Sequence, residues 1–405
     1  MRILAVYRHF WPDSPPYASM LRTITAHLVR EGHSVGVLTE QPGYKTADRK
    51  ELSPARETLD GVDVRRLSRL PGSRAEIIRR IAAVLFPVRV VLHALGARLR
   101  GERYDMLWTA TMPPAINGWG TRIAARILDA KFVYHLQDVY PELQTLAGNW
   151  RENGLLARVI GRIDTTNTDH AAACIALSED MVDTVAARGV DRSKIHVINN
   201  FMLASYGEEP ALPERFARND KVFRVIFAGN VGRFQGLEAF VDAARLLADR
   251  RLNIEFMVLG EGAALEGLKT RASGLPNIRF EGHVPFGTAK SVIASAALGL
   301  VSIQPGIYRT AYPSKTLTYL GLGVPILAAI EPQSALARDI VKNGLGWVAA
   351  GLDGAALAQS IREAYDSRGE IASARALALA YYERHLSRNA ALTRWVDIIR
   401  KLEES

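Results

Sequence analysis

The chain has 405 residues, of which 48% are hydrophobic and 23% are charged, and its formal net charge is +9. This length exceeds one ordinary core and predicts two domains of a soluble globular protein. A single cysteine, Cys174, excludes an internal disulfide and a thiolate zinc cluster, and is typical of a reducing compartment. The net positive charge favours an anionic ligand or an acidic membrane face as the partner. Nucleic acid is not expected as a partner, since zinc-finger spacing and RNP-like aromatic motifs are absent.

The N-terminal sequence alternates between strand and helix patterns. Residues 3–7 and 34–39 are predicted strands, and residues 20–31 a helix between them, so a parallel sheet is expected. The loop at residues 10–17 follows the first strand, at the edge where open α/β sheets bind ligands. It contains no glycine and is therefore not a dinucleotide-binding GxGxxG loop. Its prolines would stiffen a binding loop and an idle loop equally well.

Residues 73–103 combine a broad apolar surface with arginines. On a helix, Arg79, Arg89 and Arg100 would fall on one side, and Pro87 would kink the helix. Such a basic amphipathic segment can lie on an anionic membrane. It can equally be a pair of domain helices whose apolar side covers a sheet. We expect no membrane-spanning helix, because no run of 18 apolar residues is free of charge.

A predicted strand at residues 131–135 leads into two carboxylates, Asp138 and Glu142. A carboxylate at a strand end can orient a hydroxyl group or accept its proton. An Asx turn or a helix cap would explain Asp138 as well. His135 lies inside the strand, and we expect it to be packed rather than catalytic.

The alternation restarts after residues 202–221, which are rich in Gly, Pro, Glu and Asn and are interpreted as a linker. The strand predicted at residues 223–228 opens into the loop 229–236, whose glycines allow backbone to approach a ligand. Arg233 in this loop could grip a phosphate. The two halves together predict an α/β protein with two doubly wound, Rossmann-like domains facing a shared cleft.

Lys315 stands at the start of a predicted helix that is followed by a buried strand at residues 324–329. Free backbone N–H groups and a lysine charge favour a phosphate or a diphosphate at such a helix start. An ordinary βα unit with a solvated lysine is the alternative. The second basic loop, which contains Arg233, favours the anion site.

Four stretches resemble family 4 of the retaining glycosyltransferases, which have the GT-B fold. The likeness covers nearly the whole chain, and it is strongest to bacterial enzymes of O-antigen, capsule and exopolysaccharide assembly, such as L-fucosamine transferases. The stretches are Trp11 to Arg22 with Gly32 to Val35, Gln137 to Glu142, Gly229 to Leu237, and Pro313 to Lys315 with Tyr319 to Pro325.

The resemblance implies transfer from a nucleotide-sugar, by default a UDP-sugar, to a saccharide or an undecaprenyl-linked acceptor. It implies no metal and no cofactor, and a cytoplasmic enzyme peripheral at the inner face of the cell membrane. Asp138 would be catalytic, and Arg79, Arg89 and Arg100 would meet the membrane surface. Pro16, Tyr17 and Arg22 would bind the acceptor. The donor would be bound by Asn230, Gly232, Arg233, Gln235, Ser314, Lys315 and Thr318.

The sequence departs from the family pattern in several places, among them the C-terminal glycine loop, where the usual Arg-x(4)-Lys spacing is shortened and Gln235 is near the position of the lysine. Two glutamates typical of the family align with Thr310 and Thr318, and the usual glycine pair of the first loop appears as Pro16-Tyr17. A histidine common near the acceptor aligns with Gln137, which leaves Asp138 as the polar participant. Two alternatives therefore stay open: a sugar-nucleotide epimerase of the same fold, and a degenerate scaffold subunit that binds sugar-nucleotides. An epimerase would have several carboxylates lining the cleft, and this sequence shows few. The presence of both Arg233 and Lys315 argues against the degenerate scaffold subunit.

We place the acceptor-binding domain at residues 1–201 and the nucleotide-sugar-binding domain at residues 222–385, with residues 202–221 between them. A final helix within residues 386–405 is expected to pack back on the first domain.

Overall fold

The computed structural model describes the chain except residues 14, 44–51, 69–75, 204–211, 218–221, 233–234, 250–251 and 405. The chain forms two compact units, Met1–Asn199 with Ala391–Ser405, and Asn200–Ala390. Each unit is built on its own largely parallel sheet, which confirms the predicted α/β class with two doubly wound halves. Most of the predicted linker lies outside the described residues.

The described part of the first unit holds an eight-stranded sheet in the order β3-β4-β2-β1-β5-β6-β7-β8. All neighbouring strands are parallel except β3, which is antiparallel to β4. The chain proceeds outward from β1 on one side and from β5 on the other, so the switch point lies between these two strands. The strands are β1 (Arg2–Val6), β2 (Ser34–Glu40), β3 (Arg56–Leu59), β4 (Val62–Leu67), β5 (Met106–Ala110), β6 (Lys131–Leu136), β7 (Ala173–Ala176) and β8 (Ile195–Val197).

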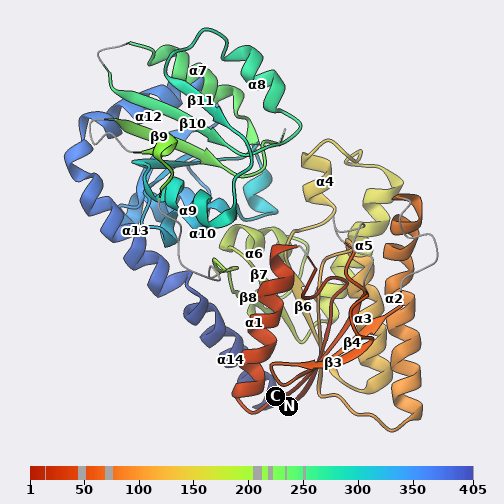
Figure 1. The fold of residues 1–405 in the computed structure, drawn as a ribbon. Coiled ribbons are helices and arrows are strands. Elements are labelled where there is room, and N and C mark those ends of the chain that lie inside the picture. The colour runs from red at the N-terminus through yellow and green to blue at the C-terminus, as the bar shows by residue number, and fades with distance from the viewer. Residues whose placement is uncertain are drawn as a thin grey trace. The chain divides into compact units, whose positions relative to one another are not determined.

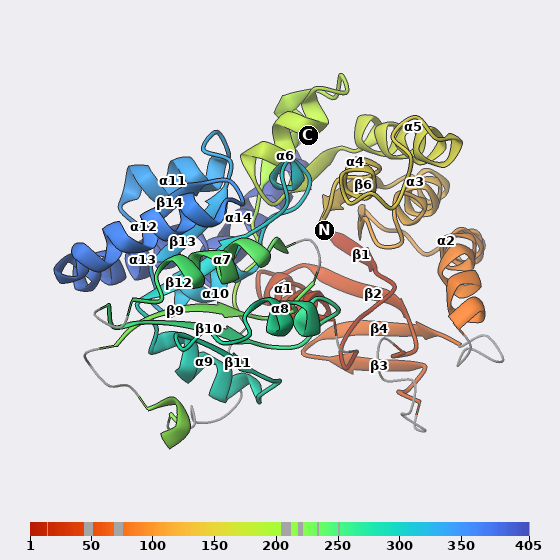
Figure 2. The same ribbon diagram turned by 90° about the horizontal axis from the view of Figure 1, so that it is seen from above.

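Three helices of this unit form one layer, in which α3 packs against both α2 and α5 (Figures 1 and 2). The helix α2 runs as one element through Pro87, whose ring lies against α3. A Cβ atom on Gly120 of α3 would come within 2.4 Å of the Pro87 Cβ, so glycine permits this close approach. The helices are α1 (Pro16–Arg30), α2 (Glu76–Leu99), α3 (Ile116–Leu128), α4 (Glu142–Leu146), α5 (Leu155–His170) and α6 (Glu179–Ala186).

The last helix, α14 (Arg388–Glu404), contributes Ala391 onward to the first unit. The Trp395 ring packs on Trp108 of β5 with the ring centroids 4.4 Å apart. The N-terminal ammonium of Met1 lies 2.9 Å from Glu403 Oε1, which brings the two chain ends side by side (Figure 1). Hydrophobic stacking and a terminal ion pair thus attach the C-terminal segment to the N-terminal sheet.

The second unit has, in its described residues, a six-stranded parallel sheet in the order β11-β10-β9-β12-β13-β14, with its switch point between β9 and β12. The strands are β9 (Phe223–Ala228), β10 (Ile254–Leu259), β11 (Ile278–Glu281), β12 (Leu298–Ser302), β13 (Ile326–Ile330) and β14 (Gly346–Ala350). The α-helices are α7 (Glu238–Leu246), α8 (Leu265–Arg271), α9 (Phe286–Ala294), α10 (Lys315–Gly321), α11 (Ala335–Asn343), α12 (Gly354–Asp366) and α13 (Ile371–His385).

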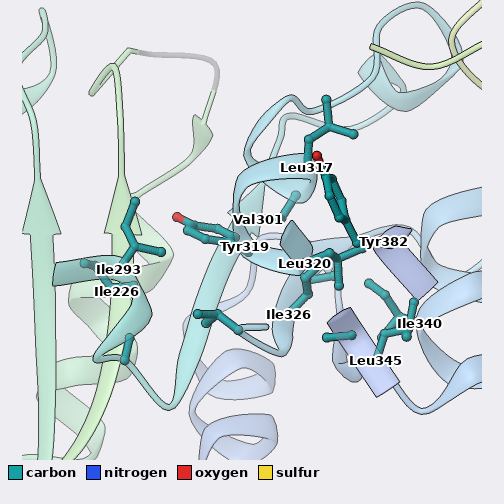
Figure 3. Packing of buried hydrophobic residues seen from close by; sticks show 14 of the residues in the cluster. Ile226, Ile293, Val301, Leu317, Tyr319, Leu320, Ile326, Ile340, Leu345 and Tyr382 are labelled. Atoms are coloured by element: carbon teal, nitrogen blue, oxygen red, sulfur yellow. The ribbon is translucent and has the colours of Figure 1, made fainter. Parts of the chain in front are cut away.

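Tyr319 of α10 connects the core of the second unit to the end of β9. Its ring is fully buried among the residues of Figure 3, and its hydroxyl accepts a hydrogen bond from the Ala228 backbone N–H at 3.0 Å. The ring has room because Gly299 of β12 lacks a side chain, since a Cβ there would lie 2.5 Å from the Tyr319 Cγ. Core packing therefore holds the strand end from which the loop at Gly229 starts.

We expect Gly299→Ala to lower the free energy of unfolding of the second unit by about 1–3 kcal/mol, because the added methyl group would overpack the Tyr319 ring. The matched control is Gly267→Ala in α8, where nothing lies within 4 Å of an added Cβ. This change should be neutral or stabilising by up to ~1 kcal/mol, because alanine favours helix. Denaturant unfolding of both variants measures the difference, and equal stability of the two would contradict the packing argument.

Candidate functional site

The carboxyl ends of β9 and β12 bring the glycine loop and Lys315 together at the switch point of the second sheet. Lys315 Nζ lies 4.6 Å from the centroid of the Phe227 ring in β9. A Cβ on Gly229, which has φ of +128°, would come within 3.1 Å of the Lys315 Cε. The absence of a side chain at Gly229 therefore makes room for the lysine.

The Lys315 ammonium is half-buried, and among the described residues no carboxylate lies within ion-pair distance of it. Burial lowers the pKa of Lys315 to about 8, because desolvation disfavours the charged form and no described anion offsets it. An anion bound at Nζ would relieve this penalty. The lysine is thus not the solvated surface charge of an ordinary βα unit.

Three further predicted donor-binding residues lie in the loop after β9. The Gly232 backbone N–H donates a hydrogen bond to Gln235 Oε1 at 3.1 Å, and a Cβ on Gly232 would lie 3.0 Å from the Asn230 Nδ2. Asn230 is exposed, and Gly232 and Gln235 are half-buried. Arg233 lies outside the described residues. The described part of this loop therefore gathers the amide groups of Asn230 and Gln235 around Gly232.

The other two predicted donor-binding residues frame the start of α10. Ser314 is exposed and its side chain makes no capping hydrogen bond, while Thr318 is half-buried one turn later. The helix has only seven residues, so the charge at this end of the sheet comes mainly from the Lys315 ammonium rather than from a long helix dipole.

Two glycines after β10 hold the loop in place, a role that sequence reasoning missed. A Cβ on Gly260 would lie 2.0 Å from the Gly229 carbonyl oxygen, and one on Gly262 would lie 2.3 Å from the Val231 carbonyl oxygen. The Val231 N–H donates to the Glu261 carbonyl at 2.8 Å. The Gly-x-Gly spacing directly after a predicted strand was the signal that such close backbone contact was required.

In the first unit, the two carboxylates that follow β6 have different surroundings. Glu142 pairs with Arg188, whose Nη1 also lies 2.8 Å from Oδ2 of the buried Asp164. Among the described residues no cation pairs with Asp138, and burial raises its pKa to about 6, while a hydrogen bond from the Tyr140 hydroxyl at 3.4 Å works in the opposite direction. A carboxyl group that titrates near neutrality is suited to accepting a proton, so Asp138 rather than Glu142 fits that role.

Tyr17 and Gln137 are linked through His135. The Tyr17 hydroxyl lies 2.9 Å from His135 Nδ1, and the Gln137 amide nitrogen lies 2.8 Å from His135 Nε2. His135 is only 2% exposed, and burial lowers its pKa to about 3, so the ring is neutral near pH 7. His135 is packed, as predicted, but sequence reasoning missed that it connects two polar groups beside Asp138.

The structure does not bring Arg22 together with Tyr17. Arg22 Nε donates to Asp60 Oδ2 at 2.8 Å, and its guanidinium lies 5.1 Å from the centroid of the Trp11 ring. Asp60 belongs to the β3–β4 hairpin turn, which the sequence analysis did not identify. Pro16 opens α1, and its side chain lies outside the described residues.

Two of the three predicted membrane-surface arginines are ion-paired. Arg89 Nη1 lies 3.4 Å from Glu40 Oε1, and Arg100 Nε lies 2.8 Å from Glu102 Oε1. Arg79 lies in α2, but its side chain is outside the described residues. Residues 81–99 of α2 form one described helix that could cross a membrane by length and composition alone. The sequence analysis expected no such helix, because Arg89 and Arg98 interrupt the apolar run. The core helix of a soluble protein can have the same length and composition.

The described residues contain no candidate metal site. No group of three or more His, Cys, Asp or Glu side chains there could hold a metal ion.

Two family descriptions match the chain, one for each half. Residues 17–200 match "Glycosyl transferase 4-like domain", and residues 222–367 match "Glycosyl transferases group 1". A probable glycosyltransferase WbjE of Pseudomonas aeruginosa is 25% identical over 301 residues, 72% of this chain and 73% of that protein. The putative colanic acid biosynthesis glycosyl transferase WcaI of Escherichia coli K12 is 23% identical over 353 residues, 84% of this chain and 85% of that protein.

Solved structures with low sequence identity share the fold over the whole chain. HepE of Anabaena in complex with UDP has a TM-score of 0.68 at 17% identity, covering 99% of this chain and 100% of that one. Sucrose-phosphate synthase of Thermosynechococcus elongatus has a TM-score of 0.73 at 15% identity, covering 100% of both chains. HepE was also solved with UDP-glucose, with a TM-score of 0.67 at 17% identity and coverage of 99% and 100%.

We expect Asp138→Asn to stabilise the protein at neutral pH and to lose this effect in acid. The native carboxyl keeps its proton up to about pH 6, whereas the unfolded chain releases it near the ordinary value of 3.8. Between these values the native state binds more protons than the unfolded state, so ionisation of Asp138 costs stability as pH rises. Thermal unfolding of wild type and variant across this window measures the difference.

The control for this experiment is Glu142→Gln, which should instead lower stability at neutral pH because Arg188 loses an ionic partner. A pH-independent difference between Asp138→Asn and wild type would show that Asp138 is not an unpaired, desolvated carboxyl.

Proposed function

Since this chain is a glycosyltransferase of the GT-B type, with a 4-like domain and a group 1 domain, we propose that it moves a sugar from a nucleotide-sugar to a saccharide acceptor. The observation that carries the proposal is the half-buried Lys315 ammonium at the switch point, beside a glycine loop and without a described anionic partner. A diphosphate is the group that such a site would stabilise. HepE was solved with UDP and UDP-glucose, which supports a UDP-sugar as donor.

We infer that Lys315 acts on the leaving diphosphate. As the bond between the sugar and the diphosphate breaks, negative charge develops on the β-phosphate oxygens. A preorganised ammonium in a partly desolvated site stabilises this charge more than water would. Bound diphosphate also raises the pKa of the lysine above its ligand-free value of about 8, which keeps it charged during transfer. The same charge makes a metal ion unnecessary in this proposal, and we propose transfer without metal or cofactor.

On the acceptor side, we propose Asp138 as the group that orients the attacking hydroxyl and accepts its proton. Its carboxyl is ionised above about pH 6, and it follows Gln137, which His135 connects to Tyr17. Tyr17, Gln137 and Asp138 thus form a polar set at the carboxyl ends of β1 and β6. Retention of the anomeric configuration is proposed from the family resemblance.

The names of the curated relatives support a setting in polysaccharide assembly, since WcaI is described as a colanic acid biosynthesis enzyme. We propose that the acceptor is a lipid-linked saccharide of a bacterial surface polysaccharide, of the O-antigen or exopolysaccharide kind. The enzyme would then work from the cytoplasm at the inner face of the cell membrane. The apolar exposed side of α2 supports this location.

Lys315→Ala should lower kcat/KM for sugar transfer by about 10²–10³-fold, because a charge on the leaving group is lost. In wild type, UDP affinity should fall as pH rises above about 8, where Lys315 loses its proton, and the variant should lack this dependence. The matched control is Lys269→Ala in α8, where the lysine is exposed and paired with Glu266. Isothermal titration and initial rates measure both effects; unchanged rates in Lys315→Ala would remove the central claim.

The fall of kcat/KM at acid pH should reflect the protonation of Asp138. We expect kcat/KM of wild type to fall as pH drops through about 6, because protonation removes the base. Asp138→Asn should be slow and should lack this fall, while its UDP affinity stays at the wild-type value. An unchanged fall at acid pH in the variant would assign the proton transfer to another group.

A further inference from the structure

We propose that one side of the first unit docks on the anionic leaflet of a membrane through apolar side chains of four segments, and that these segments start at the edge of the sheet that carries Asp138. We call these side chains the lipid-facing surface; its members are the stripe Ile81, Val84, Leu85, Val88, Leu92, Leu95 and Leu99 of α2, together with Met112, Leu146, Leu155, Leu156 and Val159. The inference rests on the proposed function and deepens it, because it names the partner that would present the acceptor.

The α2 stripe is the first observation. Its seven large apolar side chains are between 38% and 89% exposed. Apart from the adjacent pair Val84 and Leu85, they recur every three or four residues, which places them along one side of the helix. The other side is also apolar and is buried through Ala82, Phe86, Val90, Ala94 and Ala97. A helix that buries one apolar face and still exposes another is unusual on a soluble protein and marks a surface that meets an apolar partner.

The remaining members extend the stripe toward one edge of the sheet. Leu155 and Leu156 open α5 and are 80% and 55% exposed, Leu146 ends α4, and Met112 lies just before α3. These segments follow β5 and β6, and α2 follows β4, so all of them start from the carboxyl ends of parallel strands. The layer of α2, α3 and α5 in Figures 1 and 2 brings their starts together at that edge. Asp138 follows β6 at the same edge.

The charges beside the lipid-facing surface indicate which partner it binds. Between Glu76 and Glu102 the sequence has no acidic residue. In residues 151–163, Arg151, Arg158 and Arg162 are exposed, and among the described residues none of them forms an ion pair. Glu152 is the one carboxylate of that stretch. Apolar side chains flanked by unpaired arginines match the interior and the head groups of an anionic leaflet.

The packing of α2 argues that the helix lies in the membrane interface and does not cross the bilayer. Pro87 and the buried side of α2 are held against α3 at Gly120 with no room for a Cβ. To span a bilayer, α2 would have to leave this contact and expose its buried face. Partial insertion of the outward stripe needs no such rearrangement. An acceptor carried by a lipid in the same leaflet would then enter at the edge where Asp138 lies.

The test is binding of the full chain to vesicles of phosphatidylcholine with about one-third phosphatidylglycerol, compared with phosphatidylcholine alone. Two double variants, Val84→Glu with Val88→Glu and Leu155→Glu with Leu156→Glu, should each reduce binding to the anionic vesicles by about tenfold or more. Arg158→Gln with Arg162→Gln should weaken the preference for anionic lipid. The matched control is Leu246→Glu with Val341→Glu in the second unit, at residues that are 61% and 70% exposed, and it should bind as wild type does.

UDP affinity separates the two proposals. We expect all of these variants to bind UDP as wild type does, and to transfer sugar to a water-soluble acceptor saccharide at the wild-type rate. Wild type that fails to bind vesicles, or lipid-facing variants that bind them unchanged, would overturn the docking surface and leave the proposed transfer standing. Sedimentation adds a further test. If wild type is a dimer and the α2 double variant is a monomer, a second copy of the chain covers the stripe, and the docking surface is overturned.

Discussion

The cost of keeping an ammonium group out of water shapes the binding end of the second unit. Lys315 sits over the Phe227 ring in a position that lowers its pKa. Three glycines surround this arrangement: Gly229 makes room for the lysine, and Gly260 and Gly262 let the neighbouring strand end press against the loop. Tyr319 then ties the start of the loop to the core through a hydrogen bond to Ala228. A penalty of this kind is retained where an anionic ligand offsets it.

In the first unit, burial and ion pairing likewise distinguish the carboxylates that follow β6. Arg188 forms ion pairs with both Glu142 and the buried Asp164, and these contacts fix the turn after β6. Asp138 lies in the same turn with no cationic partner in the described part of the chain, and burial raises its pKa to about 6. A structural ion pair and a titratable group therefore occur four residues apart. The difference between them comes from the position of Arg188, which follows α6, and not from the carboxylates themselves.

Local patterns in the sequence were sufficient for most of the regular structure. The β-strands β1, β2, β6, β9 and β10 are short apolar runs bounded by turn residues, so their existence followed from periodicity. The hairpin of β3 and β4 was missed although its turn carries the signal Asp60-Gly61, with φ of 52° and 83°. Its strands are half-exposed and polar, with sequences RETL and VDVRRL, and therefore lack the apolar run that marked the others.

The sequence by itself determined the α/β class, the two halves and the glycine loop, and it pointed to Lys315 as a candidate site residue, because these depend on local spacing and on residue type. It could not decide which charges are free. Arg22, Arg89 and Arg100 looked available, but the tertiary structure pairs them with Asp60, Glu40 and Glu102. Conversely, only the folded chain leaves Lys315 and Asp138 without ionic partners among the described residues, and exposes apolar side chains on four segments of the first unit. Pairing and exposure depend on residues far apart in sequence, so the packing of the folded chain decides them.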